Sequence, residues 1–412
     1  MSHPLANDPL LTVVSKNFPP QVSGSAILLN NLLSNYKGRI NAIVGYHRYA
    51  KADGGFRPPC PTQYLSFPRT LPRVYENLKR RMPMVVCRIL RNSIRRAFTT
   101  LGTNVVLTAF PYDDLVVASF LAARDLRLPF YVHMHDLWKE NVPSGSIAAR
   151  FAERWEPLIL KEATRVLCMT EAMQEYYAKD GIETHLLPHC VSDQDYLTAP
   201  TTIRPPLMSK PTVLFVGSVS PHMNLDALKV LATASELLPP EYELLYCTAP
   251  DITALHRLGI SSRRLRTMYV SRAEVQRLQS EAHVLIAPLS HKNCSINEVR
   301  TVFSTKLLEY LVAGRPIIVF APEGSFHVAS ARKNGWGYVV TEDSPGALAS
   351  AIVKVVTDEQ LAAALVHSAY REAKARKATC HAGQLREWVF QDARQSACLA
   401  GRRMVKKVEV AS

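Results

Sequence analysis

Apolar strand-like runs alternate with helical patterns along most of the chain, and this alternation constrains the fold more than any other feature. In the first half the strand-like runs cover 10–18, 40–46, 103–110, 128–136 and 164–170, and the clearest helical patterns cover 25–36 and 115–126. Strands that are joined through helices run parallel within one sheet. The sequence therefore predicts β-α-β units and a mainly parallel sheet.

The second half repeats this alternation after a proline-rich linker. The stretch 198–210, "TAPTTIRPPLMSK", separates the halves, and strand-like runs follow at 211–219, 242–248, 283–289 and 316–320. A chain of 412 residues also exceeds what one hydrophobic core usually organises. We predict an α/β protein with domains at 1–205 and 206–385. Residues 386–412 are predicted to form a terminal helix and basic tail, with a return to the first domain as one option.

Composition indicates a folded protein without an export signal. Apolar residues make up 47% and charged residues 20%, which is ordinary for globular domains. The sequence contains no segment long and apolar enough to cross a bilayer, and no basic start followed by an apolar run. The 8 cysteines are scattered singly, which suits reduced thiols. We expect a cytoplasmic protein that can work at the inner face of a membrane.

The net charge of +14 favours an anionic partner. Within 69–96, basic residues alternate with apolar ones in a pattern typical of an amphipathic interfacial helix. This segment predicts peripheral contact with an anionic membrane, and the alternative is a solvated helix face. Nucleic acid is not expected as a partner, because the basic residues lack the interleaved aromatic side chains that stack on bases.

The segment "FSTKLLEYLVAGRPIIV", 303–319, puts a lysine where a helix dipole disfavours it. Ser304 or Thr305 is the predicted N-cap, so Lys306 lies in the first turn and Glu309 one turn further on. A diphosphate bound at the helix start would compensate the lysine, and the glutamate would accept hydrogen bonds from a ribose diol. The alternative is an ordinary surface pair at i,i+3 spacing.

Residues 305–319 resemble the K-L-x-E-Y-L-x-A-G-x-P-I-x-V signature of GT-B glycosyltransferases, especially the retaining family 4 group. The resemblance extends more weakly over most of the chain. It implies a GT-B architecture in which two Rossmann-like, doubly wound domains face each other across a cleft. It also implies that Glu309 binds the donor ribose, while Lys306 and the helix start at Ser304, Thr305 and Leu307 bind the donor diphosphate.

Further donor and substrate positions follow from the resemblance. Gly217 and Ser218 end a strand in "VLFVGSV", where glycine permits close approach to the backbone. Val270 and Ser271 resemble the loop beside the nucleotide base. Gly24 and Ser25 open a helix after "NFPPQVS", in the position of the family's substrate loop.

Catalysis is assigned to His135, Asp136 and Lys306. The strand "LPFYVHMHD" ends in polar residues at its carboxyl edge, and the resemblance places His135 beside the donor sugar and the acceptor. A structural His-Asp pair is the alternative. No metal is expected, because the Asp193 and Asp195 pair lacks a strand-end setting and because lysine and helix dipoles can stabilise a departing diphosphate.

The chain departs from the family pattern at two places. Ser218 replaces the arginine of the diphosphate loop, so Lys306 and either Arg300 or Arg315 must supply the charge. Thr301 stands where the commoner motif has its first glutamate, and Glu298 lies nearby but off register.

The sequence therefore predicts a glycosyltransferase that moves a hexose from a nucleoside diphosphate sugar to an acceptor hydroxyl with retention. Its acceptor is expected to be a glycan or lipid-linked acceptor in surface polysaccharide or glycolipid assembly. No cofactor is expected beyond this co-substrate. The alternatives are a non-catalytic nucleotide-binding scaffold and a sugar-nucleotide epimerase of the same fold.

Overall fold

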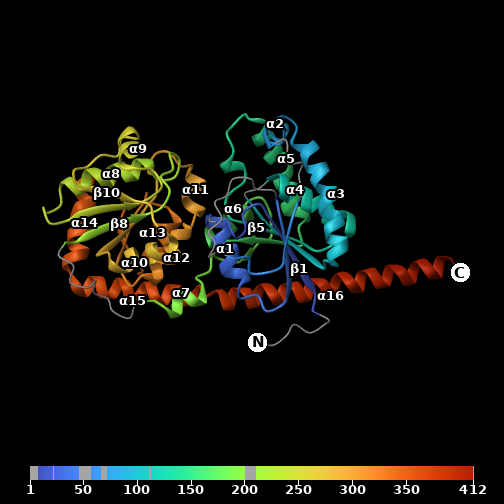
Figure 1. Ribbon diagram of the computed structural model, residues 1–412. Helices are drawn as coiled ribbons and strands as arrows, with labels where there is room; N and C mark the ends of the chain where they lie inside the picture. Colours follow the sequence, from blue (N-terminus) through green and yellow to red (C-terminus); the bar gives the residue numbers. More distant parts are fainter. Residues whose placement is uncertain are drawn as a thin grey trace. The chain divides into compact units, whose positions relative to one another are not determined.

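The computed structural model describes residues 8–21, 23–45, 57–65, 72–110, 113–199 and 210–411, and it divides the chain into two compact units. The first unit comprises residues 1–190 and 378–412, and the second unit comprises residues 191–377. Each unit has a parallel sheet with helices packed on it (Figure 1). The predicted α/β class with two Rossmann-like sheets is confirmed.

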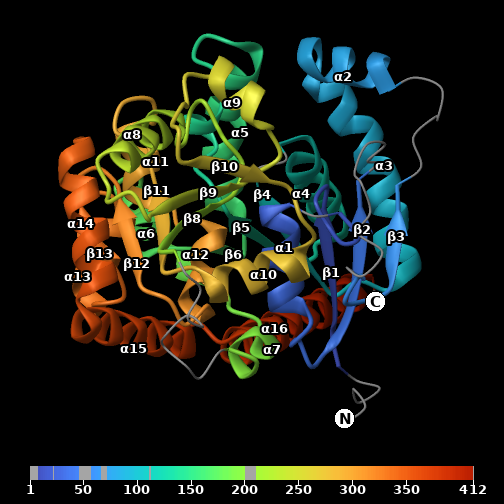
Figure 2. The same cartoon turned by 60° about the vertical axis from the view of Figure 1, so that its left-hand side comes forward.

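The sheet of the first unit has seven strands in the order β3-β2-β1-β4-β5-β6-β7. Figure 2 shows β1, β2 and β3 side by side. The strands are β1 (Leu10–Ser15), β2 (Arg39–Val44), β3 (Thr62–Tyr64), β4 (Val105–Phe110), β5 (Phe130–Met134), β6 (Arg165–Cys168) and β7 (His185–Leu186). The continuous apolar runs of β1 and β4 are buried throughout, as expected for parallel strands covered on both faces.

The helices of the first unit cover both faces of this sheet. They are α1 (Gly24–Leu33), α2 (Pro72–Arg81), α3 (Pro83–Leu101), α4 (Asp113–Leu126), α5 (Ile147–Glu162), α6 (Glu171–Ala178) and α16 (Ala378–Ala411), with a 3-10 turn at Lys139–Asn141. On one face, Leu11 and Val13 of β1 share a core with residues of α1 and α16. On the other face, α4 contacts β1, β4 and β5, and α3 packs on α4.

The last helix, α16, belongs to the first unit although the second unit precedes it in the chain. Ala378, Ala382, Leu385 and Val389 are fully buried in the first unit's core. Asp392 accepts hydrogen bonds from Arg165 and from the hydroxyl of Tyr131. The unit limits at 190 and 377 therefore differ from the predicted boundaries at 205 and 385, because these apolar side chains of α16 complete the first core. Most of the predicted linker, 200–209, lies outside the described residues.

The sheet of the second unit has six strands in the order β10-β9-β8-β11-β12-β13. They are β8 (Thr212–Val216), β9 (Glu243–Cys247), β10 (Leu265–Met268), β11 (Val284–Pro288), β12 (Ile317–Phe320) and β13 (Tyr338–Val340). The order reverses between β8 and β11, whose loops therefore leave in opposite directions. In doubly wound sheets, ligands bind outside the carboxyl ends of the strands at this reversal.

The helices of the second unit are α7 (Asp193–Leu197), α8 (Leu225–Glu236), α9 (Ile252–Arg257), α10 (Arg272–Glu281), α11 (Ile296–Thr301), α12 (Thr305–Val312), α13 (Phe326–Asn334), α14 (Pro345–Thr357) and α15 (Glu359–Ala375). Val213 and Phe215 of β8 pack with α8 and α14 in one buried cluster. At its start and end the unit is closed by a bridge between Val191 and Lys377, where the Val191 N–H donates to the carbonyl of Arg376 at 2.8 Å.

Candidate active site

Lys306 lies in the first turn of α12 and reaches back to the carboxyl end of β8. A β-carbon built on Gly217 would lie 1.9 Å from its Nζ, so only glycine leaves room for this amine. Gly217 also has a φ of 150°, which side chains rarely adopt. The amine lies 5.9 Å from the ring centroid of Phe215. The sequence predicts that a ligand approaches the Gly217 backbone, whereas in the structure the Lys306 amine lies in this space.

Burial lowers the pKa of Lys306 to about 8, while Glu309 and Cys247 oppose that shift. A desolvated ammonium is less stable than one in water, because the surrounding protein solvates the charge poorly. An anion bound beside Nζ would restore the charged form.

Glu309 lies one turn deeper in α12. One of its oxygens, Oε2, accepts a hydrogen bond from Nε2 of the buried Gln279 at 3.2 Å. Glu309 also borders a cavity of about 400 Å³, which is otherwise lined by residues of α7, α10 and the end of α12. Lys306 does not line this cavity. The two predicted donor residues are close enough to interact electrostatically.

The start of α12 agrees with the predicted N-cap at Ser304, with Thr305 as the first helical residue. The Ser304 side chain makes no capping hydrogen bond, and its backbone N–H donates to Nε2 of His327 at 3.0 Å. His327 is fully buried, which lowers its pKa to about 4 and keeps it neutral. Leu307 is buried and its N–H bonds the Ser304 carbonyl at 3.0 Å.

Tyr310 supports the same strand end. Its hydroxyl accepts a hydrogen bond from the Val216 N–H at 2.9 Å, one residue before Gly217. The register of β8 with β11 includes only Val213 and Leu214. Tyr310 therefore binds a backbone donor at the end of the strand, and it is a residue of this site that the sequence analysis did not identify.

The neighbouring loops supply the remaining donor-side residues. Ser218 is exposed, and its carbonyl accepts a bond from Asn224, the N-cap of α8. Ser271 is the N-cap of α10, where its hydroxyl accepts from the Glu274 N–H at 3.4 Å. Val270 precedes it, and its backbone bonds the Cys247 thiol. The Gly217 N–H in turn bonds the Cys247 carbonyl at 2.9 Å.

The two arginines that could supply further charge, Arg300 and Arg315, differ in their exposure to solvent. Arg300 is exposed. Arg315 is buried, and its Nε donates to the Ser280 carbonyl at 2.6 Å, so it fastens α10 to the end of α12. A diphosphate role of Arg315 stays a prediction, and its Nε is already engaged with this carbonyl.

The position of the first motif glutamate has a structural role. Thr301 is buried and bonds the Asn297 carbonyl in its own helix at 2.9 Å. Glu298, one turn earlier, bonds His222 at 2.7 Å and lies beside the thiol of Cys294. Asp193 and Asp195, which the sequence does not favour as a metal site, lie in α7, where Asp193 contacts Lys377 at 3.8 Å and Asp195 accepts from Gln276.

A chain of buried histidines lies at the carboxyl end of β5 in the first unit. Nε2 of His133 lies 3.0 Å from the Leu187 carbonyl, and Nε2 of His135 lies 3.2 Å from Nδ1 of His133. Burial lowers the pKa of His133 to about 4 and that of His135 well below its usual value. The His189 ring lies edge-on to His135, with centroids 5.9 Å apart.

The hydrogen bonds determine which nitrogens carry protons. A carbonyl can only accept, so neutral His133 donates from Nε2 and accepts at Nδ1, and His135 donates from its own Nε2. Nδ1 of His135 is then an acceptor, buried and without a hydrogen-bond partner among the described residues. This atom can accept a bond from a substrate hydroxyl. Asp136 follows His135 directly and is half-buried.

The predicted substrate loop begins α1 of the first unit. Gly24 is the first residue of α1 and is exposed, and Ser25 follows it half-buried. The cap is Ser23, whose hydroxyl accepts from the Ala26 N–H at 3.3 Å. Gly24, Ser25 and His135 belong to the first unit, whereas the residues around Lys306 belong to the second.

Comparisons with known proteins agree with these features. Residues 210–358 match the family model described as glycosyl transferases group 1, and residues 41–188 match a glycosyl transferase 4-like domain. No curated protein matches the chain by sequence.

Similar solved structures include HepE of Anabaena in complex with UDP and glucose, at 16% identity and a TM-score of 0.64, covering 92% of this chain and 99% of that one. A sucrose-phosphate synthase of Thermosynechococcus elongatus has 17% identity and a TM-score of 0.66, with 98% and 100% coverage. A UDP-forming trehalose-phosphate synthase of Burkholderia vietnamiensis has 12% identity and a TM-score of 0.64, with 94% and 100% coverage.

Proposed function

This chain belongs to the group 1, family 4-like glycosyltransferases of GT-B fold, and from that premise we propose that it transfers a hexose from a nucleoside diphosphate sugar to an acceptor hydroxyl with retention of configuration. The observation that carries the proposal is the half-buried Lys306 amine at the carboxyl end of β8. This end borders the reversal of strand order in the second sheet, where ligands of doubly wound folds bind.

Lys306 acts on the leaving group. As the bond between sugar and diphosphate breaks, negative charge grows on the departing phosphate oxygens, and a cation already held in a poorly solvated place stabilises that charge strongly. Donor binding raises the pKa of the lysine from its low value in the free protein. The same proton-bearing amine therefore contributes to donor binding and, more strongly, to turnover.

Glu309 and His135 position the sugar donor and the acceptor in this proposal. The carboxylate of Glu309 accepts from the ribose diol of the nucleotide, with Gln279 holding its orientation. Nδ1 of His135 accepts a hydrogen bond from a hydroxyl of the donor sugar or the acceptor. Since burial holds the pKa of His135 well below its usual value, we assign it to orientation and not to proton abstraction at neutral pH.

The first donor to test is UDP-glucose, because HepE of Anabaena has been crystallised with UDP-glucose and with UDP. Purified protein is incubated with UDP-glucose and related donors, with and without a set of glycan and lipid-linked acceptors. Release of nucleoside diphosphate is followed together with product formation. Turnover that needs an acceptor supports a transferase. Conversion of the donor sugar without an acceptor supports an epimerase, and tight binding without either reaction supports a scaffold.

The variants Lys306→Met and Glu309→Gln test the assignment of residues. Loss of one preorganised stabilising contact to developing charge costs roughly 100- to 1,000-fold in turnover. Lys333→Met removes an exposed lysine from α13 and is the control, with turnover expected to be unchanged. Wild-type turnover in both site variants would contradict the proposal.

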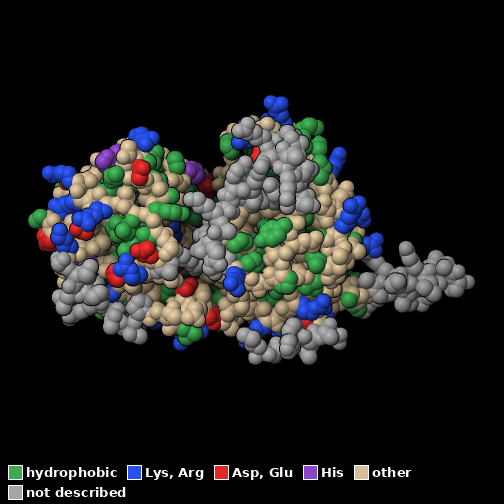
Figure 3. Space-filling view, in the orientation of Figure 1, with side chains coloured by type: hydrophobic (Ala, Val, Ile, Leu, Met, Phe, Trp, Pro, Cys, Tyr) green, Lys and Arg blue, Asp and Glu red, His purple; other side chains and the backbone are tan. Residues whose placement is uncertain are grey.

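We also propose that the acceptor is lipid-linked and that α2 and α3 contact an anionic membrane, in surface polysaccharide or glycolipid assembly. Arg88 and Arg95 of α3 are exposed at seven-residue spacing, which puts them on one side of this helix, and Arg81 is exposed at the end of α2. Beside them are the exposed apolar side chains of Met82 and Ile89. Figure 3 shows Lys and Arg side chains along this edge of the first unit.

Two residues of the predicted basic segment do not take part in this surface. Lys79 pairs with the buried Asp114 at 3.1 Å, and Arg91 pairs with Asp125 at 2.6 Å. The apolar side of α3 packs inside the unit through Leu90, Ile94 and Phe98. Residues 69–71 lie outside the described part of the chain. Of the helices whose residues the structure describes, none is long and apolar enough to cross a membrane.

A further inference from the structure

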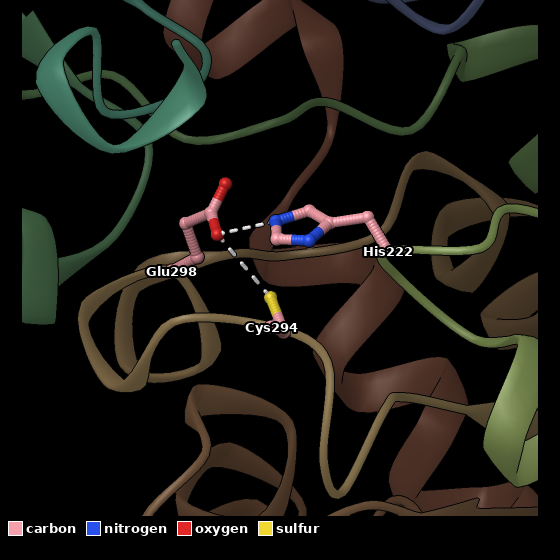
Figure 4. A group of neighbouring side chains, drawn as sticks. All are labelled: His222, Cys294 and Glu298. Carbon is pink, nitrogen blue, oxygen red and sulfur yellow. Dashed lines mark hydrogen bonds and ion pairs between the residues drawn. The ribbon is translucent and has the colours of Figure 1, made fainter. Parts of the chain in front are cut away.

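Three side chains with different metal-binding atoms converge between two loops of the second unit. His222 comes from the loop between β8 and α8, and Cys294 and Glu298 come from the segment that follows β11. Their nearest ligand atoms, one from each residue, all lie within 4.8 Å of one another. Figure 4 shows the imidazole and the thiol directed at the same carboxylate oxygen.

From this geometry we propose that His222, Cys294 and Glu298 form a binding site for a zinc-class divalent cation. An imidazole nitrogen, a thiolate and a carboxylate oxygen are the three ligand types that Zn²⁺ takes in proteins. The proposal does not depend on the transferase activity, because ion binding can be measured on the protein alone.

The distances fit a tetrahedral ion after a small adjustment. Ligand atoms bonded to Zn²⁺ lie about 3.3 to 3.8 Å apart, given bond lengths near 2.0 to 2.3 Å. The Cys294 thiol lies 3.5 Å from Oε2 of Glu298, within that range. Nε2 of His222 lies 2.7 Å from the same oxygen, so the imidazole must move outward. It can do so because its side chain is 49% exposed.

The rest of the site is held in place before any ion arrives. The backbone N–H of Ser290 donates to the Met223 carbonyl at 2.7 Å, and the Asn293 side chain bonds the Pro221 carbonyl at 3.3 Å, so the two loops are already joined. Glu298 is nearly buried and forms a capping box with Ser295 at the start of α11. Preorganised ligands of this kind lower the cost of binding an ion.

The Met223 sulfur lies 3.7 Å from the Cys294 sulfur, which makes the surroundings soft and favours thiophilic ions over magnesium or calcium. On binding, the thiol of Cys294 loses its proton to solvent and forms the metal–sulfur bond. The Nε2 proton of His222, which bonds the carboxylate in the free protein, is given up to water, and Nδ1 carries the ring proton in the complex, so that the lone pair of Nε2 binds the ion. One open position remains for water, and the carboxylate hydrogen bonds are replaced by the metal bond.

The test uses the full chain and Co²⁺ as a spectroscopic stand-in for Zn²⁺. We expect one equivalent of Co²⁺ to produce a thiolate-to-metal absorption band, and Zn²⁺ to displace it. Cys294→Ser should abolish the band, and His222→Gln and Glu298→Gln should weaken ion affinity tenfold or more. Thermal melting without metal checks that each variant is folded.

The control is the double variant Cys380→Ser/Cys398→Ser, which removes two exposed cysteines of α16 and should keep both the band and its stoichiometry. Three results would overturn the proposal. They are absence of a band in the folded wild-type protein, persistence of the band in Cys294→Ser, and its loss in the control.

Discussion

The amine of Lys306 occupies the place where any residue but glycine at position 217 would put its β-carbon. The two residues lie 89 positions apart in the sequence and meet at the end of β8. The glycine therefore leaves the space in which the Lys306 amine lies at the end of this strand.

Gly217→Ala should displace Lys306 and weaken donor binding about tenfold or more. The new methyl group meets the amine at 1.9 Å, and the φ of 150° adds backbone strain. The matched control is Gly324→Ala, which also has a positive φ but has no atom within 4 Å of the built β-carbon. Calorimetric titration with UDP checks this prediction, and equal affinities in the two variants would contradict it.

Donor affinity should fall as the pH rises above about 8. Lys306 has a pKa of about 8 in the free protein, and the bound diphosphate favours its charged form. Above this pH, binding must therefore take up a proton, and affinity falls by as much as tenfold per pH unit. Titration in buffers with different ionisation enthalpies measures the uptake. Lys306→Met should bind more weakly with little dependence on pH in this range, and an unchanged slope would refute the assignment.

The titration of Lys306 should make the free energy of unfolding rise with pH, whereas it makes donor affinity fall. In the unfolded chain Lys306 has the ordinary lysine pKa of 10.5, so between about 8 and 10.5 the unfolded state binds more protons than the folded state. This lysine therefore makes the free energy of unfolding rise with pH across that window. Urea unfolding of the wild-type protein and of Lys306→Met at several pH values isolates the effect as the difference between the two curves.

Tyr310→Phe should destabilise the second unit by about 1 to 3 kcal/mol, because it leaves the buried Val216 N–H without its acceptor. Tyr338→Phe alters a half-buried tyrosine of β13 in the same way and serves as the control, with an expected change below about 0.5 kcal/mol. Chemical unfolding gives both values. If Tyr310→Phe leaves the free energy of unfolding unchanged, a water molecule has replaced the hydroxyl as the acceptor for the Val216 N–H.

Asp392→Asn should destabilise the first unit by about 3 to 5 kcal/mol, the usual cost of breaking a buried ion pair on one side. Asp392 is 5% exposed and bonds both Nε and Nη2 of Arg165, at 2.6 and 3.0 Å. Gln391→Ala removes a weaker contact to the same arginine at 3.3 Å and should cost much less. Urea unfolding followed by the fluorescence of Trp388, which stacks on Arg165, compares them.

Arg88→Glu/Arg95→Glu should reduce binding to anionic liposomes tenfold or more, since each cation near such a surface contributes about 1 kcal/mol. The control variant Arg257→Glu/Lys333→Glu makes the same change of charge on exposed residues of the second unit. Co-sedimentation with vesicles of increasing phosphatidylserine content measures both. Wild-type binding that ignores lipid charge would speak against membrane contact through α3.

The alternation of apolar runs was sufficient to predict both sheets, because buried parallel strands need continuous apolar segments and their connecting helices need amphipathic ones. The start of α12 at Thr305 was also predictable, since Ser304 and the following apolar spacing mark a helix start. Such strand and helix signals extend over a few neighbouring residues, so they can be recognised in the sequence itself.

Contacts between residues that are far apart in the sequence could not be predicted from such local patterns. His222 and Glu298 lie 76 residues apart, and Val216 and Tyr310 lie 94 apart, so their meeting depends on strand order and not on local spacing. The burial of Arg315 was likewise hidden, because the Ser280 carbonyl that its Nε bonds lies in another helix, 35 residues away in the sequence. The prediction of a terminal helix and basic tail did not show how much of α16 is buried, because few residues form the buried face of this helix and several of them are alanine.

The place of α16 in the first core has a consequence for synthesis on the ribosome. The first unit lacks Ala378, Ala382, Leu385 and Val389 until the ribosome has translated the whole second unit, so until then one apolar face of its sheet is only partly covered. A premature stop codon between positions 190 and 378 would therefore leave the first unit without these α16 residues, and quality-control proteases would meet an incompletely covered sheet.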